Sequence, residues 1–280
     1  MPLGDNHEGK LCSVAVSPAG DRIAVGGWTG PVAGTNSVYF FDRASGRLTG
    51  RILGLPNVIL HLAWSADGQK LALAFGNNSG IRVHSTQAPY AQLGADTDYG
   101  DQSYSVDFDR RGRLVSTGWD GKLRLYDANL RLLVPPRQLA DGTRPFLARF
   151  SPDGRRIAVG FIDSAVVRLL SGTDLTPLAT LTPIPAGTGN HGSVAWATNG
   201  RRVFATGTNR IGDGQRVVRA FDPDSGRQLA AWPASTDTIM DLQALPDGSV
   251  AFASGDSTLG ILDGNGHRRL RQSPPNPDHR

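Results

Sequence analysis

The sequence is poor in the side chains that most often form cross-links or carry out acid–base chemistry. It contains one cysteine, Cys12, which cannot form an internal disulfide, and the apolar residues around it predict a small buried side chain. It contains one glutamate, Glu8, so glutamate-dependent acid or base catalysis is unavailable outside the N-terminal segment. Both absences argue against a disulfide-stabilised secreted domain and against a glutamate-dependent enzyme.

Long apolar segments are also missing. No run approaches the roughly 18 consecutive apolar residues that a membrane span requires, and the first ten residues lack the apolar core of a secretory signal. We therefore expect a cytoplasmic protein without a membrane partner. The formal net charge of +4 is spread along the chain, so we do not expect nucleic acid as a partner either.

Motifs for catalysis, cofactors and metals are likewise lacking. There is no Gly-x-Ser-x-Gly elbow, and Lys122 follows Gly121 in an expected hairpin, which argues against a phosphate-binding loop. The histidines show no short spacing typical of zinc ligands; they are His7, His61, His84, His191, His267 and His279. We predict no enzymatic activity, no cofactor and no metal.

What the sequence does have is an internal repeat. A polar turn that ends in glycine occurs six times, with 48, 44, 42, 46 and 48 residues between successive glycines. Each turn separates two short apolar runs, which predicts a β-hairpin. The turns are 17–20, 65–68, 109–112, 151–154, 197–200 and 245–248.

A third apolar strand and a weaker fourth run follow each hairpin. Four strands per repeat without a helical stretch predict an all-β fold, a β-propeller of four-stranded antiparallel blades. We expect six blades, alone or as part of seven, in a single domain over 1–272, followed by a flexible proline-rich tail over 273–280. The expected blades are 11–54, 58–94, 103–139, 146–182, 193–233 and 239–272.

The third repeat resembles the WD40-repeat family. Its segment 116–127 is similar to the terminal signature of that family, with Tyr126 in place of the usual tryptophan. His7 precedes Ser17 by ten residues, as the histidine does in the opening of a WD40 repeat. The resemblance implies a structural hydrogen-bond network that includes His7, Asp120 and Tyr126. The sequence is identified as a divergent member of bacterial type, and its Ser-Pro-Asp-Gly turns are also common in TolB-like propellers.

The number of repeats raises the question of how the fold is closed. Seven blades are usual in the family that the sequence resembles, whereas six repeats are counted here. We expect either a six-bladed ring closed by side-chain packing, or a chain cut from, or partnered with, a longer protein that supplies another blade. The resemblance to bacterial propellers also implies a fused or separate protease, kinase or nucleotide-binding signalling module as a partner.

Long connections on one side of the repeats predict a surface for a protein or peptide partner. These connections are 27–37, 94–103, 139–145, 182–192 and 207–216. Large aromatic residues and arginines occur in or next to them, and these residue types dominate binding energy at interfaces. The alternative is that the aromatic residues only cap the blade ends. The predicted partner-binding residues are Trp28, Tyr99, Tyr104, Trp119, Arg144, Phe146, Phe161 and Arg210.

Other interpretations remain open at this point. The run Asp96-Thr97-Asp98-Tyr99-Gly100-Asp101 resembles a calcium loop, although a solvated acidic loop that contacts a basic partner fits it better. The basic segment 267–271 can dock an acidic surface or form the last outer strand. A non-catalytic scaffold or sensor is the leading functional prediction. The alternative is a propeller enzyme or a sensor of a small ligand or metal, lactonase-like or TolB-like.

Overall fold

The computed structural model describes residues 9–140, 142–181, 189–212 and 214–272. Blade 1 comprises β1 (Lys10–Val16), β2 (Arg22–Trp28), β3 (Asn36–Asp42) and β4 (Leu48–Leu55). Blade 2 comprises β5 (Ile59–Trp64), β6 (Lys70–Phe75), β7 (Ile81–Ser85) and β8 (Gln92–Asp96). Blade 3 comprises β9 (Ser103–Phe108), β10 (Leu114–Gly118), β11 (Lys122–Tyr126) and β12 (Arg137–Gln138).

The second half of the chain repeats this pattern. Blade 4 comprises β13 (Pro145–Phe150), β14 (Arg156–Phe161), β15 (Val167–Ser171) and β16 (Pro177–Leu181). Blade 5 comprises β17 (Ser193–Trp196), β18 (Val203–Thr206), β20 (Gln215–Phe221) and β21 (Gln228–Ser235). Blade 6 comprises β22 (Ile239–Ala244), β23 (Val250–Ser254), β24 (Leu259–Leu262) and β25 (Arg268–Gln272).

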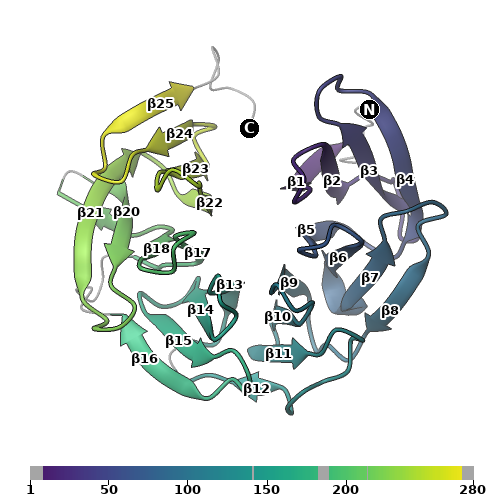
Figure 1. Cartoon of the computed structure of the whole chain (residues 1–280), viewed down its shortest axis with the longest axis horizontal. Coiled ribbons are helices and arrows are strands. Elements are labelled where there is room, and N and C mark those ends of the chain that lie inside the picture. The colour runs from purple at the N-terminus through teal and green to yellow at the C-terminus, as the bar shows by residue number, and fades with distance from the viewer. Residues whose placement is uncertain (1–8, 141, 182–188, 213, 273–280) are drawn as a thin grey trace. The chain divides into compact units, whose positions relative to one another are not determined.

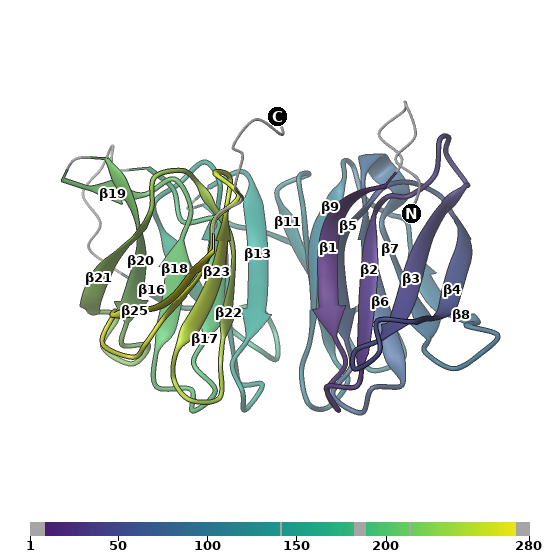
Figure 2. The ribbon, with the colours of Figure 1, turned by 90° about the horizontal axis from the view of Figure 1, so that it is seen from above.

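The fold is all-β and consists of six antiparallel propeller blades, as predicted (Figure 1). In blades 1 to 4 and 6 the chain passes from one strand to its neighbour (Figure 2), and the strand pairs are antiparallel. Blade 5 differs from the prediction, because a short additional strand, β19 (Arg210–Ile211), pairs with the beginning of β20. The described chain contains one 3-10 turn, η1 (Asn77–Ser79), and no helix long and apolar enough to cross a membrane.

The glycine that ends each predicted turn explains why the hairpins could be found from sequence. Gly20 and Gly68 have φ values of +74° and +71°, a region that residues with a Cβ atom rarely adopt. The amide of each donates to the carbonyl of the serine three residues earlier, at 2.8 and 2.9 Å. These local requirements fix the turn between the first and second strands of a blade.

The chain divides into two compact units, which are described separately here. Unit 1 spans 1–138 and contains blades 1 to 3, and unit 2 spans 139–280 and contains blades 4 to 6. The single propeller domain over 1–272 therefore stays a prediction. The tail over 273–280 and the segment that contains His7 lie outside the described residues.

In blade 2 the second strand turns large side chains to one neighbouring blade and alanines to the other. We call the face toward the preceding blade the leading face and the face toward the following blade the trailing face. The leading face of blade 2 carries Ile59, Leu62 and Phe75, which pack on blade 1. Its trailing face carries Ala72 and Ala74, which pack on blade 3. Small side chains on this second strand let the next blade approach closely.

A basic side chain also links neighbouring blades. In unit 1, Arg22 Nη1 donates to the carbonyl of Thr86 at 2.9 Å, and Lys70 Nζ donates to the carbonyl of Ala128 at 2.7 Å. In unit 2, Arg156 Nη1 donates to the carbonyl of Pro223 at 3.2 Å, and Arg202 Nη1 donates to the carbonyl of Gly264 at 2.9 Å. Each donor lies two residues after the turn glycine, and each acceptor lies just after the third strand of the next blade. We call this contact the clasp.

One buried-residue prediction is wrong. Cys12 is exposed, because β1 has a bulge between Leu11 and Ser13 that takes Cys12 out of its pairing with β2.

Candidate protein-binding site

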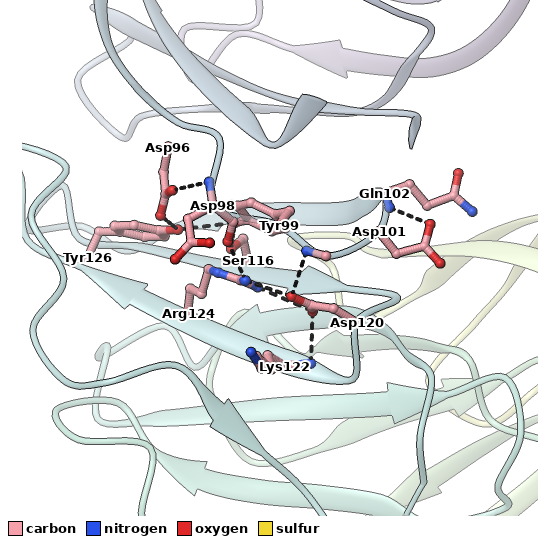
Figure 3. Close-up of polar contacts among 11 residues, drawn as sticks. Asp96, Asp98, Tyr99, Asp101, Gln102, Ser116, Asp120, Lys122, Arg124 and Tyr126 are labelled. Carbon is pink, nitrogen blue, oxygen red and sulfur yellow. Dashed lines mark hydrogen bonds and ion pairs between the residues drawn. The ribbon is translucent and has the colours of Figure 1, made fainter. Parts of the chain in front are cut away.

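The loop between β8 and β9, residues 97–102, lies on the long-connection side of unit 1 and is held by blade 3. Tyr99 inserts its side chain into the blade and is 5% exposed. Its Oη is 2.5 Å from Ser116 Oγ and 3.1 Å from Tyr126 Oη (Figure 3). Tyr126 Oη in turn donates to Asp96 Oδ2 at 2.7 Å. Burial raises the pKa of both tyrosines well above the usual value, so both hydroxyls stay protonated.

A buried arginine completes this arrangement. Arg124 Nη2 donates to Asp120 Oδ2 at 2.6 Å and to the carbonyl of Asp98 at 2.6 Å. Its guanidinium carbon lies 3.7 Å from the centre of the Tyr99 ring, a cation–π contact. Burial on its own raises the pKa of Asp120, but the hydrogen bonds and charge of Arg124 outweigh burial and lower that pKa. The pair is therefore ionised, and it contacts the loop backbone at the carbonyl of Asp98 and the amide of Gly100.

Gly118 allows these groups to meet. A Cβ atom at this position would lie 2.5 Å from Asp120 Oδ1 and 3.2 Å from the Tyr99 ring. The glycine at the end of β10 is therefore required by the close packing of the turn against the loop.

Two aromatic residues of blade 3 stack at the surface beside this network. The rings of Tyr104 and Trp119 lie 5.5 Å apart with an interplanar angle of 6°. Trp119 N donates to the carbonyl of Gln102 at 2.9 Å, which ties the β10–β11 turn to the loop 97–102. Both side chains are partly exposed. The stacked pair is a rigid apolar platform that keeps an accessible edge.

The loop 97–102, which Trp119 contacts through Gln102, carries exposed carboxylates. Asp98 and Asp101 are exposed in the loop 97–102, and Asp101 Oδ1 accepts from the amide of Gln102 at 2.7 Å (Figure 3). Asp96 Oδ1 accepts from the amide of Asp98 at 2.8 Å. The loop is thus an acidic rim with an internally fixed backbone. Within the described ranges, no three His, Cys, Asp or Glu side chains gather in a way that could hold a metal ion. The metal-dependent alternative stays a prediction.

The predicted partner-binding residues fall into two groups. Trp28, at the end of β2 in blade 1, is 44% exposed, and Arg144 and Arg210 are exposed in unit 2. The amide of Arg144 donates to Asp163 Oδ1 at 3.2 Å. Trp28 belongs to blade 1 and the Tyr104–Trp119 pair to blade 3.

Three of the predicted contact residues are buried and are not available to a partner. Tyr99 belongs to the network of blade 3, and Phe146 and Phe161 are buried within unit 2. Phe161 pairs with His191 through an isolated bridge next to β14. An aromatic residue at a strand end can turn into the blade or toward solvent, and the sequence alone did not separate these outcomes. For these three residues the capping alternative describes the structure.

Asp120 and Tyr126, which the sequence assigned to a structural network, do belong to one set of contacts. They do not touch directly in that set; Tyr99 and Arg124 connect them. Sequence reasoning missed Arg124. A signal was present, since this arginine stands between Leu123 and Leu125 in a short apolar strand. Sequence reasoning also missed the contact between Ser116 and Tyr99.

Residues 98–127 match the family model of the WD domain, G-beta repeat. Blade 3 is therefore similar to a WD40 repeat over these residues. The matched segment contains Tyr99, Ser116, Asp120 and Tyr126, so it covers most of the network described above. A comparison with curated proteins gave no match.

Asp120 and Tyr126 belong to the contacts of blade 3, as the family resemblance implies, and Tyr126 stands where the family usually has tryptophan. The hydroxyl of Tyr99 contacts Ser116 and also the second tyrosine, Tyr126. His7 lies outside the described residues, so its predicted part in a network of blade 1 remains a prediction.

Proposed function

We propose that the chain is a non-catalytic interaction module, a scaffold or sensor, that binds a protein or peptide on the long-connection side of unit 1. The observation that carries the proposal is the stacked Tyr104–Trp119 pair held beside an acidic loop. Aromatic residues with fixed orientation bind large apolar area at low cost in side-chain entropy. The fixed backbone of the loop 97–102 supports the same interpretation, because a preorganised surface loses less freedom on binding.

The charge of this surface indicates the chemistry of the partner. Although the whole chain has a formal net charge of +4, the exposed charges of the loop 97–102 are Asp98 and Asp101. A partner segment with a basic residue next to an aromatic or aliphatic side chain fits both features. Trp28 in unit 1, and Arg144 and Arg210 in unit 2, are proposed as further contact points. The partner carrying this segment is proposed to be a protease, kinase or nucleotide-binding signalling protein in the cytoplasm.

A displayed library of random peptides of about 12 residues tests this proposal directly. The intact chain is expected to select peptides that combine a basic residue with an adjacent apolar one. Trp119→Ala should weaken binding of the selected peptides about 30-fold, which corresponds to about 2 kcal/mol for a buried aromatic anchor. Trp119→Phe should retain part of the affinity.

Matched controls separate recognition from folding. Leu178→Ala removes an exposed apolar side chain from β16 of unit 2 and should leave peptide affinity unchanged. Replacing Asp98 and Asp101 together with asparagine should abolish the preference for basic peptides while the circular dichroism spectrum stays the same. Selection of peptides that bind Trp119→Ala and the intact chain equally would contradict the proposed site.

A further inference from the structure

The leading face of blade 1 is exposed at positions that are buried in the next blade. β1 and β5 pair with their neighbours in the same register, including a bulge at the equivalent place. Leu11, Val14 and Val16 are 51%, 65% and 51% exposed. The residues 48 positions later, at the same places in β5, include Ile59 and Leu62, which are 0% and 3% exposed because they pack on blade 1.

The clasp of blade 1 is also incomplete on this face. In blades 2, 3, 5 and 6, the carbonyl just after the third strand accepts from a basic residue of the preceding blade. The equivalent carbonyl in blade 1 belongs to Arg43. An open hollow of about 310 Å³ lies here, lined by Gly20, Asp21, Asp42, Arg43 and Ala44. Asp21 and Asp42 line it together with Arg43, whose Nη1 donates to the carbonyl of Gly20 at 3.1 Å.

The described blades leave no basic residue at the clasp position for this hollow. Arg22, Lys70, Arg156 and Arg202 already donate to the blades that follow them. In blade 3 the turn is one residue shorter, and Arg113 pairs with Asp109 of its own turn at 2.7 Å. In blade 6 the turn is also one residue shorter, and the equivalent residue, Ser249, is not basic. A second copy of the chain carries the same residues in the same contacts.

We propose that the leading face of blade 1 is a docking surface for one further propeller blade, supplied by another polypeptide. The docked blade presents small side chains on its second strand, as Ala72 and Ala74 do in blade 2, and places Arg or Lys at the clasp position. The apolar strand β1 and the hollow at Arg43 are then covered together, as their equivalents are in blade 2. This surface is distinct from the Tyr104–Trp119 site, so either proposal can fail without the other.

The chain itself supplies a probe of the required chemistry. A copy of residues 58–101, which contains blade 2 with Lys70, is inserted between Glu8 and Gly9 of the full chain. Val14→Cys in a Cys12→Ser background provides a single thiol on the leading face. We expect the inserted blade to slow labelling of this thiol at least about tenfold, since Leu62 is buried at the equivalent place. Lys70→Glu in the inserted copy alone should restore much of the labelling.

Three results would overturn the proposal. The first is unchanged labelling with the inserted blade and also with a second version that carries a copy of blade 4, residues 143–189, with Arg156. The second is slow labelling of the thiol at position 14 in the chain without an insert, which means that the face is already covered. Light scattering then distinguishes cover by a second copy, which gives a concentration-dependent dimer, from cover by the same chain. The third is faster labelling of that thiol after removal of residues 2–8, which would show that this segment covers the face.

Photo-cross-linking tests whether another polypeptide supplies the blade. Benzoylphenylalanine replaces Val14 in cells that express the full chain, and the cross-linked peptides are sequenced. A partner peptide with two short apolar strands around a turn, followed by Arg or Lys two residues after the turn glycine, is the expected result. Cross-links only to this chain, or to peptides without that pattern, would overturn the assignment.

Discussion

His191 makes the stability of unit 2 depend on pH. Its side chain is fully buried, and its Nδ1 lies 2.9 Å from the carbonyl oxygen of Ala165, so the neutral ring carries its proton on Nδ1. Burial, offset in part by this hydrogen bond and reinforced by the charge of Arg219, lowers the pKa from 6.5 to about 4. Protonation therefore costs more in the folded state than in the unfolded state.

The sign and size of the effect follow from this difference in pKa. Above pH 6.5 both states hold a neutral ring, and the histidine adds no pH dependence. As the pH falls below 6.5 the unfolded state binds a proton that the folded state does not bind, so the free energy of unfolding decreases. The decrease is about 2 kcal/mol between pH 7 and pH 5 and levels off at about 3 kcal/mol below the folded pKa.

Urea unfolding followed by tryptophan fluorescence between pH 4.5 and 7.5 measures this effect. His191→Asn keeps a donor for the Ala165 carbonyl but cannot titrate, so its unfolding free energy should change less with pH than that of the intact chain. The carboxylates that also titrate in acid are common to both proteins and cancel in the difference. His267→Gln, at an exposed histidine, is the matched control and should behave like the intact chain. Parallel pH profiles for His191→Asn and the intact chain would refute the reasoning.

Two further substitutions test the packing of the blades. Arg124→Met leaves the buried carboxylate of Asp120 without its ion-pair partner and should lower the free energy of unfolding, measured in urea, by about 3 kcal/mol. Adding Asp120→Asn should recover part of the loss. If the effects of the two substitutions on the free energy of unfolding were strictly additive, the pairing would be contradicted. Arg156→Ala removes the clasp to Pro223, the ion pair with Asp224 and the contact with the Trp196 ring, and should cost about 1 to 2 kcal/mol in thermal unfolding. Arg155→Ala, at a side chain that is 86% exposed, should cost less than about 0.5 kcal/mol, and equal effects of the two would contradict the clasp.

Much of the fold could be predicted from sequence because its signals are local. The turn glycines with positive φ, the apolar runs beside them and the spacing near 45 residues identify each hairpin and each third strand without knowledge of distant contacts. The predicted third strand after each hairpin is present, for example as β7 and β15. The short strand β19 escaped prediction because two residues carry too little periodicity to be recognised.

The candidate site was predicted less completely, since it depends on how side chains from different segments meet. Trp119 and Tyr104 were identified as surface aromatics, but the stacking between them joins a turn to a strand 15 residues away. Tyr99 was placed with them because its position in an acidic loop suggests exposure. The hydroxyl of Ser116 and the guanidinium of Arg124 draw it into the blade instead. The clasp had a sequence signal, a basic residue two positions after the turn glycine, but its acceptor cannot be recognised from residue type.

That acceptor has a consequence for how such a chain evolves. Every clasp ends on a main-chain carbonyl, and the residues that present it are threonine, alanine, proline and glycine. Because any amino acid supplies a carbonyl, the accepting side tolerates mutational drift, and selection acts only on the donor. A duplicated repeat therefore always presents a carbonyl that can accept from the preceding blade. One retained arginine or lysine is enough for it to form the clasp with the blade that follows. The asymmetry allows repeats to diverge widely in sequence, as these six have, while the contact between them persists.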